Sequence, residues 1–134
     1  HRHAPEMEHQ ISMMGQEVSV TFVPHLLPTI RGIEVTAYVS TSLSVSEARD
    51  LFVSRYQDEP MVSVVSDGEH PETRWVRGSN QCMIGVYQQQ PGHLIISSVI
   101  DNLVKGAAGQ AIQNMNLMLG LNEFEALPMC ALSP

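Results

Sequence analysis

The sequence has few of the residues that mark several large classes of protein. It contains two cysteines, and its 7 basic residues stand against 14 acidic ones. Two cysteines are too few for a disulfide framework and lack the spacing of a zinc site, so we expect Cys82 and Cys130 to be inert, reduced thiols. The formal net charge of −7 disfavours nucleic acid or an anionic membrane as the main partner.

Long apolar stretches are also missing. No run approaches the roughly 20 residues that cross a bilayer, and the first residues carry no apolar signal segment. We therefore expect a cytoplasmic protein without a membrane partner. The chain begins at His1 without a methionine, which indicates a piece of a longer protein.

Hydrophobic residues make up 43% of the sequence. This fraction is enough to form the core of one compact domain over residues 1–134. Alternation of apolar and polar residues predicts strands over residues 18–23, 33–39, 61–65, 75–77, 83–88 and 93–100. Helical spacing predicts helices over residues 5–14, 44–57 and 102–119, and Ser44 with Glu47 forms a capping box at the start of the second. Pro91-Gly92 supplies a turn that makes a hairpin of the last two strands. This order predicts an α+β fold, with a mixed, largely antiparallel sheet and helices packed on one face.

Two glycines interrupt the last predicted helix. Gly106 and Gly109 each cost about 1 kcal/mol relative to alanine in a helix interior. They predict that this part of the helix lies close to another backbone or to a ligand, and tight packing on the sheet explains them equally well. Asn102 stands at the start of the helix, where an N-cap would satisfy free backbone donors.

Histidine and arginine gather at the N-terminus. His1 and His3 flank Arg2 just before the first predicted helix, and an imidazole can both take and return a proton near neutral pH. A surface cluster or a tag remnant explains the same residues. A metal site built from His1, His3 and His9 is a third alternative, although it lacks a recognisable zinc spacing.

A second group of such residues lies in a loop bounded by prolines. His25 and Arg31 share this loop, and loops held by rigid strands commonly carry binding groups. Arg31 can hold a carboxylate or a phosphate through two parallel hydrogen bonds. A solvated surface arginine is the alternative.

Four stretches of the chain, in this order, resemble the C-terminal portion of N-acetyl-γ-glutamyl-phosphate reductases. The matching stretches are HRHAPEME at 1–8, FVPHLLPTIRGI at 22–33, WVRGSNQC at 75–82 and DNLVKGAAGQAIQNMNLMLGL at 101–121. The resemblance implies the C-terminal domain of a two-domain enzyme similar to glyceraldehyde-3-phosphate and aspartate-semialdehyde dehydrogenases. An N-terminal Rossmann domain would bind NADPH and contribute a catalytic cysteine, and the helix over residues 101–121 would pack on that domain.

The resemblance also implies roles for particular residues. His3 looks like the acid/base partner of the cysteine, and His1 is the second candidate. His25 and Arg31 look like substrate-binding residues, with Arg31 holding an anionic group of N-acetyl-glutamyl phosphate.

The cofactor side follows from the same resemblance. Asn102, Lys105 and Gly106 look like residues that bind NADP, with Asn102 near the nicotinamide carboxamide. The domain would form a homo-oligomer, either a dimer or a tetramer.

The chain departs from the family pattern in one respect. It contains no Rossmann glycine fingerprint and no cysteine at the position of the nucleophile. A dimerisation or scaffold module without activity of its own is therefore a second hypothesis. The equivalent reductase of lysine biosynthesis, which acts on an aminoadipyl phosphate, is an alternative within the enzyme class, because one methylene is hard to read from pocket residues.

Overall fold

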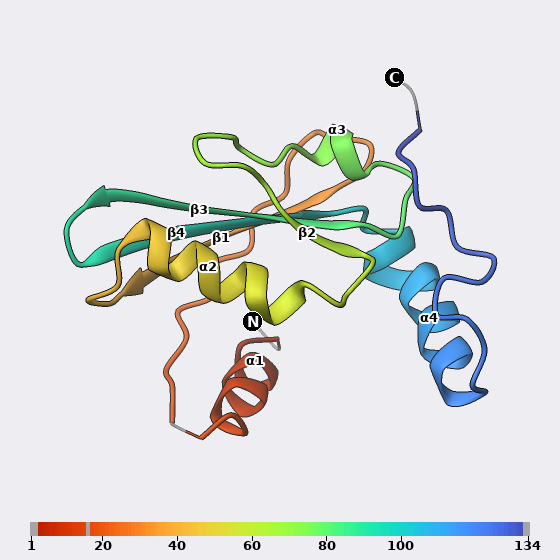
Figure 1. Ribbon diagram of the computed structural model, residues 1–134, viewed down its shortest axis with the longest axis horizontal. Helices are drawn as coiled ribbons and strands as arrows, with labels where there is room; N and C mark the ends of the chain where they lie inside the picture. The colour runs from red at the N-terminus through yellow and green to blue at the C-terminus, as the bar shows by residue number, and fades with distance from the viewer. Residues whose placement is uncertain (1–2, 16, 133–134) are drawn as a thin grey trace.

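The computed structural model describes residues 3–15 and 17–132, and its centre is a four-stranded sheet (Figure 1). The strand order is β1-β4-β3-β2. The strands are β1 (Ile33–Ser40), β2 (Val62–Val64), β3 (Cys82–Gln90) and β4 (His93–Ile100). All neighbours are antiparallel except β2 and β3. The predicted α+β fold with a mixed, largely antiparallel sheet is confirmed.

The register of the sheet decides which side chains share a face. β3 and β4 form a hairpin whose turn includes Gly92 at a φ of +82°. Within it, Val86 pairs with Ile96, which in turn pairs with Ala37 of β1. Because directly opposed residues point to the same side of a sheet, these three side chains share one face.

Helix α2 (Val45–Tyr56) covers part of that face. It begins with the predicted capping box, in which Ser44 N donates to Glu47 Oε2 at 2.8 Å and Glu47 N donates to Ser44 Oγ at 3.3 Å. Ala48 packs in one buried cluster with Val86 and Leu94. The sequence therefore predicted this helix correctly, and Ala48 is its buried residue.

The opposite face is covered by the segment that carries the short helix α3 (Thr73–Val76). Gly85 lies against this segment, because a Cβ at position 85 would be only 2.9 Å from Pro71 Cδ. The predicted strand over residues 75–77 is wrong. β3 is paired with β4 along one edge and with β2 along the other, so no edge of β3 is left for this segment.

The N-terminal region confirms one prediction and contradicts another. Helix α1 (His3–Ser12) forms as expected, although it buries none of its residues. The predicted strand over residues 18–23 is wrong. Val20 N donates to the Glu8 carboxylate at 2.8 Å, so this backbone is tied to α1 instead of to a strand.

The last predicted helix is present, but its first turn is wider than an α-helix. It consists of the π-helix η1 (Val104–Ala108) and the α-helix α4 (Gly109–Met118). Gly106 N donates to Asp101 O at 2.9 Å, five residues back. The helix ends before Gly120, whose φ of +67° is the left-handed geometry expected of a helix terminator.

Among the described residues, no helix has the length and apolar character needed to cross a membrane.

Gly109 is required by packing within this chain. A Cβ on Gly109 would collide with Asn80 Oδ1 and lie 2.8 Å from Val104 O. We expect Gly109→Ala to lower the free energy of unfolding by about 1 to 3 kcal/mol, because overpacking outweighs the better helix propensity of alanine. Denaturant unfolding of the purified chain measures this difference.

Gly106→Ala is the matched control for that experiment. Its Cβ would lie no closer than 3.4 Å to any neighbour, so we expect stability to be unchanged or raised by up to about 1 kcal/mol. Equal destabilisation by both substitutions would contradict the packing explanation.

Candidate functional site

The C-terminal end of β4 leads into a buried carboxylate, Asp101. Its Oδ2 accepts from Gly78 N at 2.6 Å, and its Oδ1 accepts from Leu103 N at 2.8 Å and Val104 N at 3.0 Å. Arg31 pairs with the same carboxylate through Nε, 3.0 Å from Oδ2, and Nη2, 3.1 Å from Oδ1. One side chain therefore connects the 17–32 segment, the turn after α3 and the start of η1.

These contacts determine the charge of Asp101. Burial raises its pKa, but the hydrogen bonds from Gly78, Leu103, Arg31 and Val104 outweigh that effect, and the pKa is lowered from its ordinary value of 3.8. Asp101 is therefore a carboxylate at neutral pH. It satisfies the first backbone donors of η1, so Asp101 caps this helix.

Replacing Asp101 tests how much this cluster stabilises the fold. We expect Asp101→Asn to lower the free energy of unfolding at pH 7 by about 3 kcal/mol, because it leaves Arg31 half-buried without its partner. Because the pKa of Asp101 is lower in the folded state than its ordinary value of 3.8, the ionised carboxylate stabilises the fold at any pH above that value. This stabilisation is lost as the pH falls through the pKa of the folded state.

The difference between wild type and Asp101→Asn should therefore be largest near neutral pH and shrink below about pH 4. Denaturant unfolding at a series of pH values measures it. Glu72→Gln removes a carboxylate from the surface pair with Arg74 and should cost no more than about 1 kcal/mol. A difference that stays constant down to pH 2 would contradict the account.

Asn102, next along the chain, holds the 17–32 segment from a second side. Its Oδ1 accepts from Gly32 N at 2.8 Å across 70 positions of sequence, and its Nδ2 donates to none of the described residues. The interpretation of Asn102 as the helix N-cap is wrong, because Asp101 performs that function. The structure thus brings Arg31 and Asn102, two of the predicted site residues, into one cluster.

Lys105 lies on the other side of η1, in a chain of amide contacts. Its Nζ donates to Gln113 Oε1 at 2.7 Å, and Asn80 Nδ2 donates to the same oxygen at 3.0 Å. Gln113 Nε2 in turn donates to Glu123 Oε1 at 2.7 Å. Burial lowers the pKa of Lys105, and the nearby Cys82 and glutamates oppose this shift. Lys105 is therefore directed towards α4, while Gly106 lies exposed in η1.

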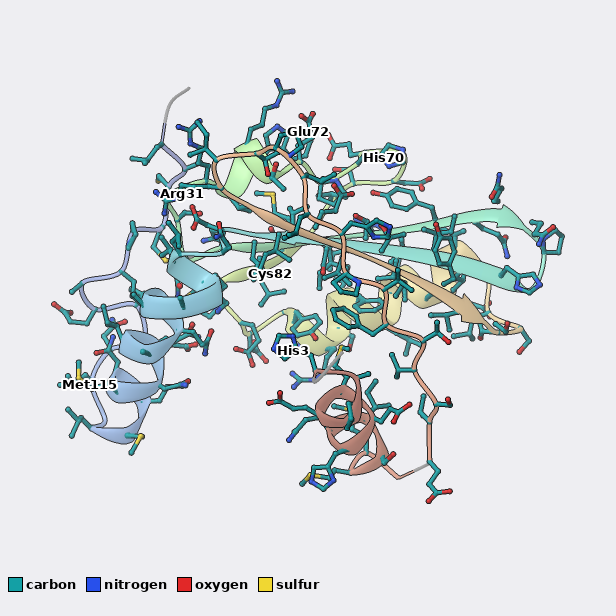
Figure 2. All side chains as sticks on the ribbon, turned by 180° about the vertical axis from the view of Figure 1, so that it is seen from behind. His3, Arg31, His70, Glu72, Cys82 and Met115 are labelled. Carbon is teal, nitrogen blue, oxygen red and sulfur yellow. The ribbon has the colours of Figure 1, made fainter. Side chains whose placement is uncertain are left out.

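The predicted histidines lie elsewhere. His3 is exposed at the start of α1, with its ring centroid 6.3 Å from that of Phe22. Figure 2 shows His3 beside α1, well separated from Arg31. His25 is exposed in the 17–32 segment. His1 and Arg2 lie outside the described residues.

The two cysteines differ in environment. Cys82 is partly buried in β3, where burial raises the pKa of its thiol and Lys105 opposes the increase. Cys130 is exposed. A raised pKa keeps the Cys82 thiol protonated at neutral pH, and a thiol is a much weaker nucleophile than a thiolate.

A pocket of about 230 Å³ opens beside Arg31. Its lining residues are Thr29, Ile30, Arg31, Thr73, Arg74 and Arg77. Within residues 3–15 and 17–132, no group of three or more histidine, cysteine or acidic side chains is arranged to hold a metal ion.

The comparison with protein families decides the classification. The family model described as semialdehyde dehydrogenase, dimerisation domain, matches residues 1–102. The chain belongs to this family. The matched region of the dimerisation domain includes His3, Arg31, Asp101 and Asn102, whereas Lys105 and Gly106 lie just beyond it.

Individual relatives of this dimerisation domain carry a more specific name. N-acetyl-gamma-glutamyl-phosphate reductase of Halorhodospira halophila is 50% identical over 137 residues, and the proteins of that name in Acidithiobacillus ferrooxidans and Azotobacter vinelandii are each 51% identical. Each alignment covers 100% of this chain and 40% of the relative. The chain thus spans about two fifths of the length of the curated relatives it matches.

Asp101 and Gln113 are the central residues that the sequence did not identify. An aspartate directly after a predicted strand and directly before a predicted helix was the available signal for Asp101. Nothing in the sequence shows that residues 31, 78 and 103 meet at it.

Proposed function

We propose that this dimerisation domain supplies the acid/base histidine and the substrate-binding residues of an NADPH-dependent N-acetyl-γ-glutamyl-phosphate reductase. The proposed enzyme converts N-acetyl-glutamyl 5-phosphate, NADPH and a proton to the 5-semialdehyde, phosphate and NADP⁺, a step of arginine biosynthesis. The observation that carries the proposal is the identity of about 50% with reductases of that name over the whole chain.

His3 would take the proton of a cysteine thiol held by the N-terminal domain. The resulting thiolate would attack the acyl phosphate carbon, the bond to the phosphate oxygen would break, and phosphate would leave. NADPH would supply the hydride that reduces the thioester. His3, now protonated, would return the proton as the semialdehyde forms. His3 is exposed at the start of α1.

Asn102 suits a place beside the nicotinamide. Its Oδ1 is occupied by Gly32 N, which fixes the side chain, and its Nδ2 donates to no described residue. An amide N–H held in this way can donate to a carbonyl oxygen such as that of the carboxamide. Lys105 and Gly106, which follow Asn102 in the chain, would also contact the cofactor. His25 and Arg31 would contact the substrate.

Two exposed apolar surfaces support two proposed interfaces, one with a second copy of the chain and one with the N-terminal domain. Every residue of β1 is exposed, including Val35 at 49% and Tyr38 at 80%, and a second copy would cover this part of the sheet. The end of α4 exposes Met118 at 86% and Leu119 at 66%, and the N-terminal Rossmann domain would cover residues 101–121. Apolar patches of this kind mark interfaces.

Kinetics of the full-length protein tests the proposed reaction. We expect NADPH oxidation with N-acetyl-glutamyl phosphate, and a kcat/KM about 10- to 200-fold lower with the aminoadipyl homologue, the range one methylene provides. A preference for the aminoadipyl substrate would place the protein in lysine biosynthesis. No turnover with either substrate would leave only the dimerisation role, which light scattering would then detect as a dimer.

A further inference from the structure

The guanidinium of Arg31 is held by one of its two hydrogen-bonding edges. Its Nη2 donates to Asp101 Oδ1 at 3.1 Å, and its Nε lies 3.0 Å from Asp101 Oδ2 in an ion pair that lacks hydrogen-bond geometry. A guanidinium is a rigid, planar group with five N–H donors, so a carboxylate on the Nε edge leaves Nη1 and one N–H of Nη2 to form the other edge. That second edge can bind another oxyanion through two hydrogen bonds.

Arg31 is one of the residues that line the pocket. Asp101 is fully buried, whereas 24% of the Arg31 side chain is exposed, and Arg31 lines the 230 Å³ pocket. The ion pair with Asp101 therefore leaves part of the Arg31 side chain open to the pocket. Thr73, which also lines the pocket, packs against Gly32, the residue after Arg31.

Two further arginines line the pocket, and they are not equivalent. Arg74 is bound to Glu72 through Nε at 2.7 Å and Nη2 at 2.8 Å. Arg77 forms no ion pair with any residue that the structure describes. In a chain with a net charge of −7, this is a local excess of positive charge that favours an anion.

The same carboxylate also fixes the surroundings of Arg31. Asp101 accepts from Gly78, which follows Arg77, and from Leu103 and Val104, which follow Asn102. Asp101 thus contacts the backbone beside both the proposed substrate-binding and the proposed cofactor-binding residues.

On the basis of the proposed reductase function, we propose that Asp101 is a positioning residue that holds Arg31 with its free edge towards the pocket, where it binds an oxyanion of the substrate. Carboxylate and phosphate share this chemistry, and inhibition separates them. Inorganic phosphate and N-acetyl-glutamate each carry one of the two groups. The inhibitor whose inhibition constant rises in Arg31→Lys identifies the group that is bound.

Steady-state kinetics of the full-length protein tests the proposal with Arg31→Lys, Asp101→Asn and the double variant. Arg31→Lys keeps the charge but cannot form the two parallel hydrogen bonds. We expect it to raise KM for the acyl phosphate at least tenfold and KM for NADPH less than threefold. Asp101→Asn should raise KM for the acyl phosphate by a similar factor.

Because both substitutions act through one group, the double variant should be no more than about twofold worse than the worse single variant. Asp50→Asn, an exposed position of α2 outside the pocket, should leave both KM values unchanged. An unchanged KM in Arg31→Lys, or losses that multiply in the double variant, would overturn the proposal. If Asp101→Asn does not fold, Asp101→Glu, which keeps the carboxylate but moves it by one methylene, takes its place in the same comparison.

A separate measurement distinguishes this proposal from the proposed function. If the wild-type protein reduces no acyl phosphate, the function is wrong, and titration with inorganic phosphate and N-acetyl-glutamate is followed through the NMR signal of Arg31 Nε–H. A saturable shift in the wild type that is absent in Asp101→Asn supports the positioned oxyanion site. No shift with either anion refutes it.

Discussion

If the proposed function holds, replacing His3 with asparagine should lower kcat of the full-length protein by about 10² to 10⁴-fold, the usual contribution of a general acid/base. Asparagine keeps the polarity and approximate size of the imidazole but cannot accept the thiol proton. KM for the acyl phosphate should change little, because His3 lies well apart from Arg31 (Figure 2). Stopped-flow measurement of NADPH oxidation gives both constants.

His9→Asn is the matched control for that substitution. His9 is exposed on the same helix as His3, so its replacement should leave kcat within about twofold, as expected of a surface histidine. A full rate in His3→Asn combined with a collapse in His1→Asn would assign the acid/base role to His1. Full rates in both variants would refute the role of this N-terminal group.

The isolated chain of 134 residues should oxidise no NADPH above background. An acid/base histidine and an anion-binding arginine have nothing to activate without a nucleophile and a bound hydride donor. Cys82 does not fill the gap, since burial raises the pKa of its thiol. The sequence also contains no glycine fingerprint for a dinucleotide.

Adding the separately purified N-terminal domain should restore turnover. The absorbance of NADPH at saturating acyl phosphate measures it. The same mixture made with His3→Asn should remain at least 100-fold slower, which shows that the restored activity uses this domain. Turnover by the isolated chain alone would contradict the division of the catalytic groups between two domains.

The sheet was largely predictable from the sequence because its central pairing is local. The alternation over 83–88 and 93–100 and the Pro91-Gly92 turn predict a hairpin, and β3 and β4 form one. The Ser44 to Glu47 capping box predicted the start of α2 correctly. Each of these signals depends on neighbours within a few residues.

Alternation predicted the wrong structure where no strand edge was available. Residues 18–23 alternate as well as β1 does, but Val18 and Val23 are 40% and 63% exposed, and Val20 is bonded to Glu8. A strand requires a partner edge as well as a pattern. The sequence cannot show which edges other strands have already filled.

The candidate site was only partly predictable for a related reason. Resemblance pointed to Arg31 and Asn102 separately, and the structure places both at the end of β4. Asp101 was missed because its importance depends on Gly78, Leu103 and Arg31 meeting at one carboxylate. For Gly109, the sequence indicated a close approach without naming the neighbour, which is Asn80.

The central claim is that this domain carries the acid/base group of the reductase and not its nucleophile. Mass spectrometry of the full-length protein, mixed with acyl phosphate in the absence of NADPH and then digested with protease, tests this claim most directly. The account predicts that the N-acetyl-glutamyl group is found on a cysteine outside residues 1–134, and that its yield falls in His3→Asn. An acyl group on Cys82 or Cys130 would contradict it.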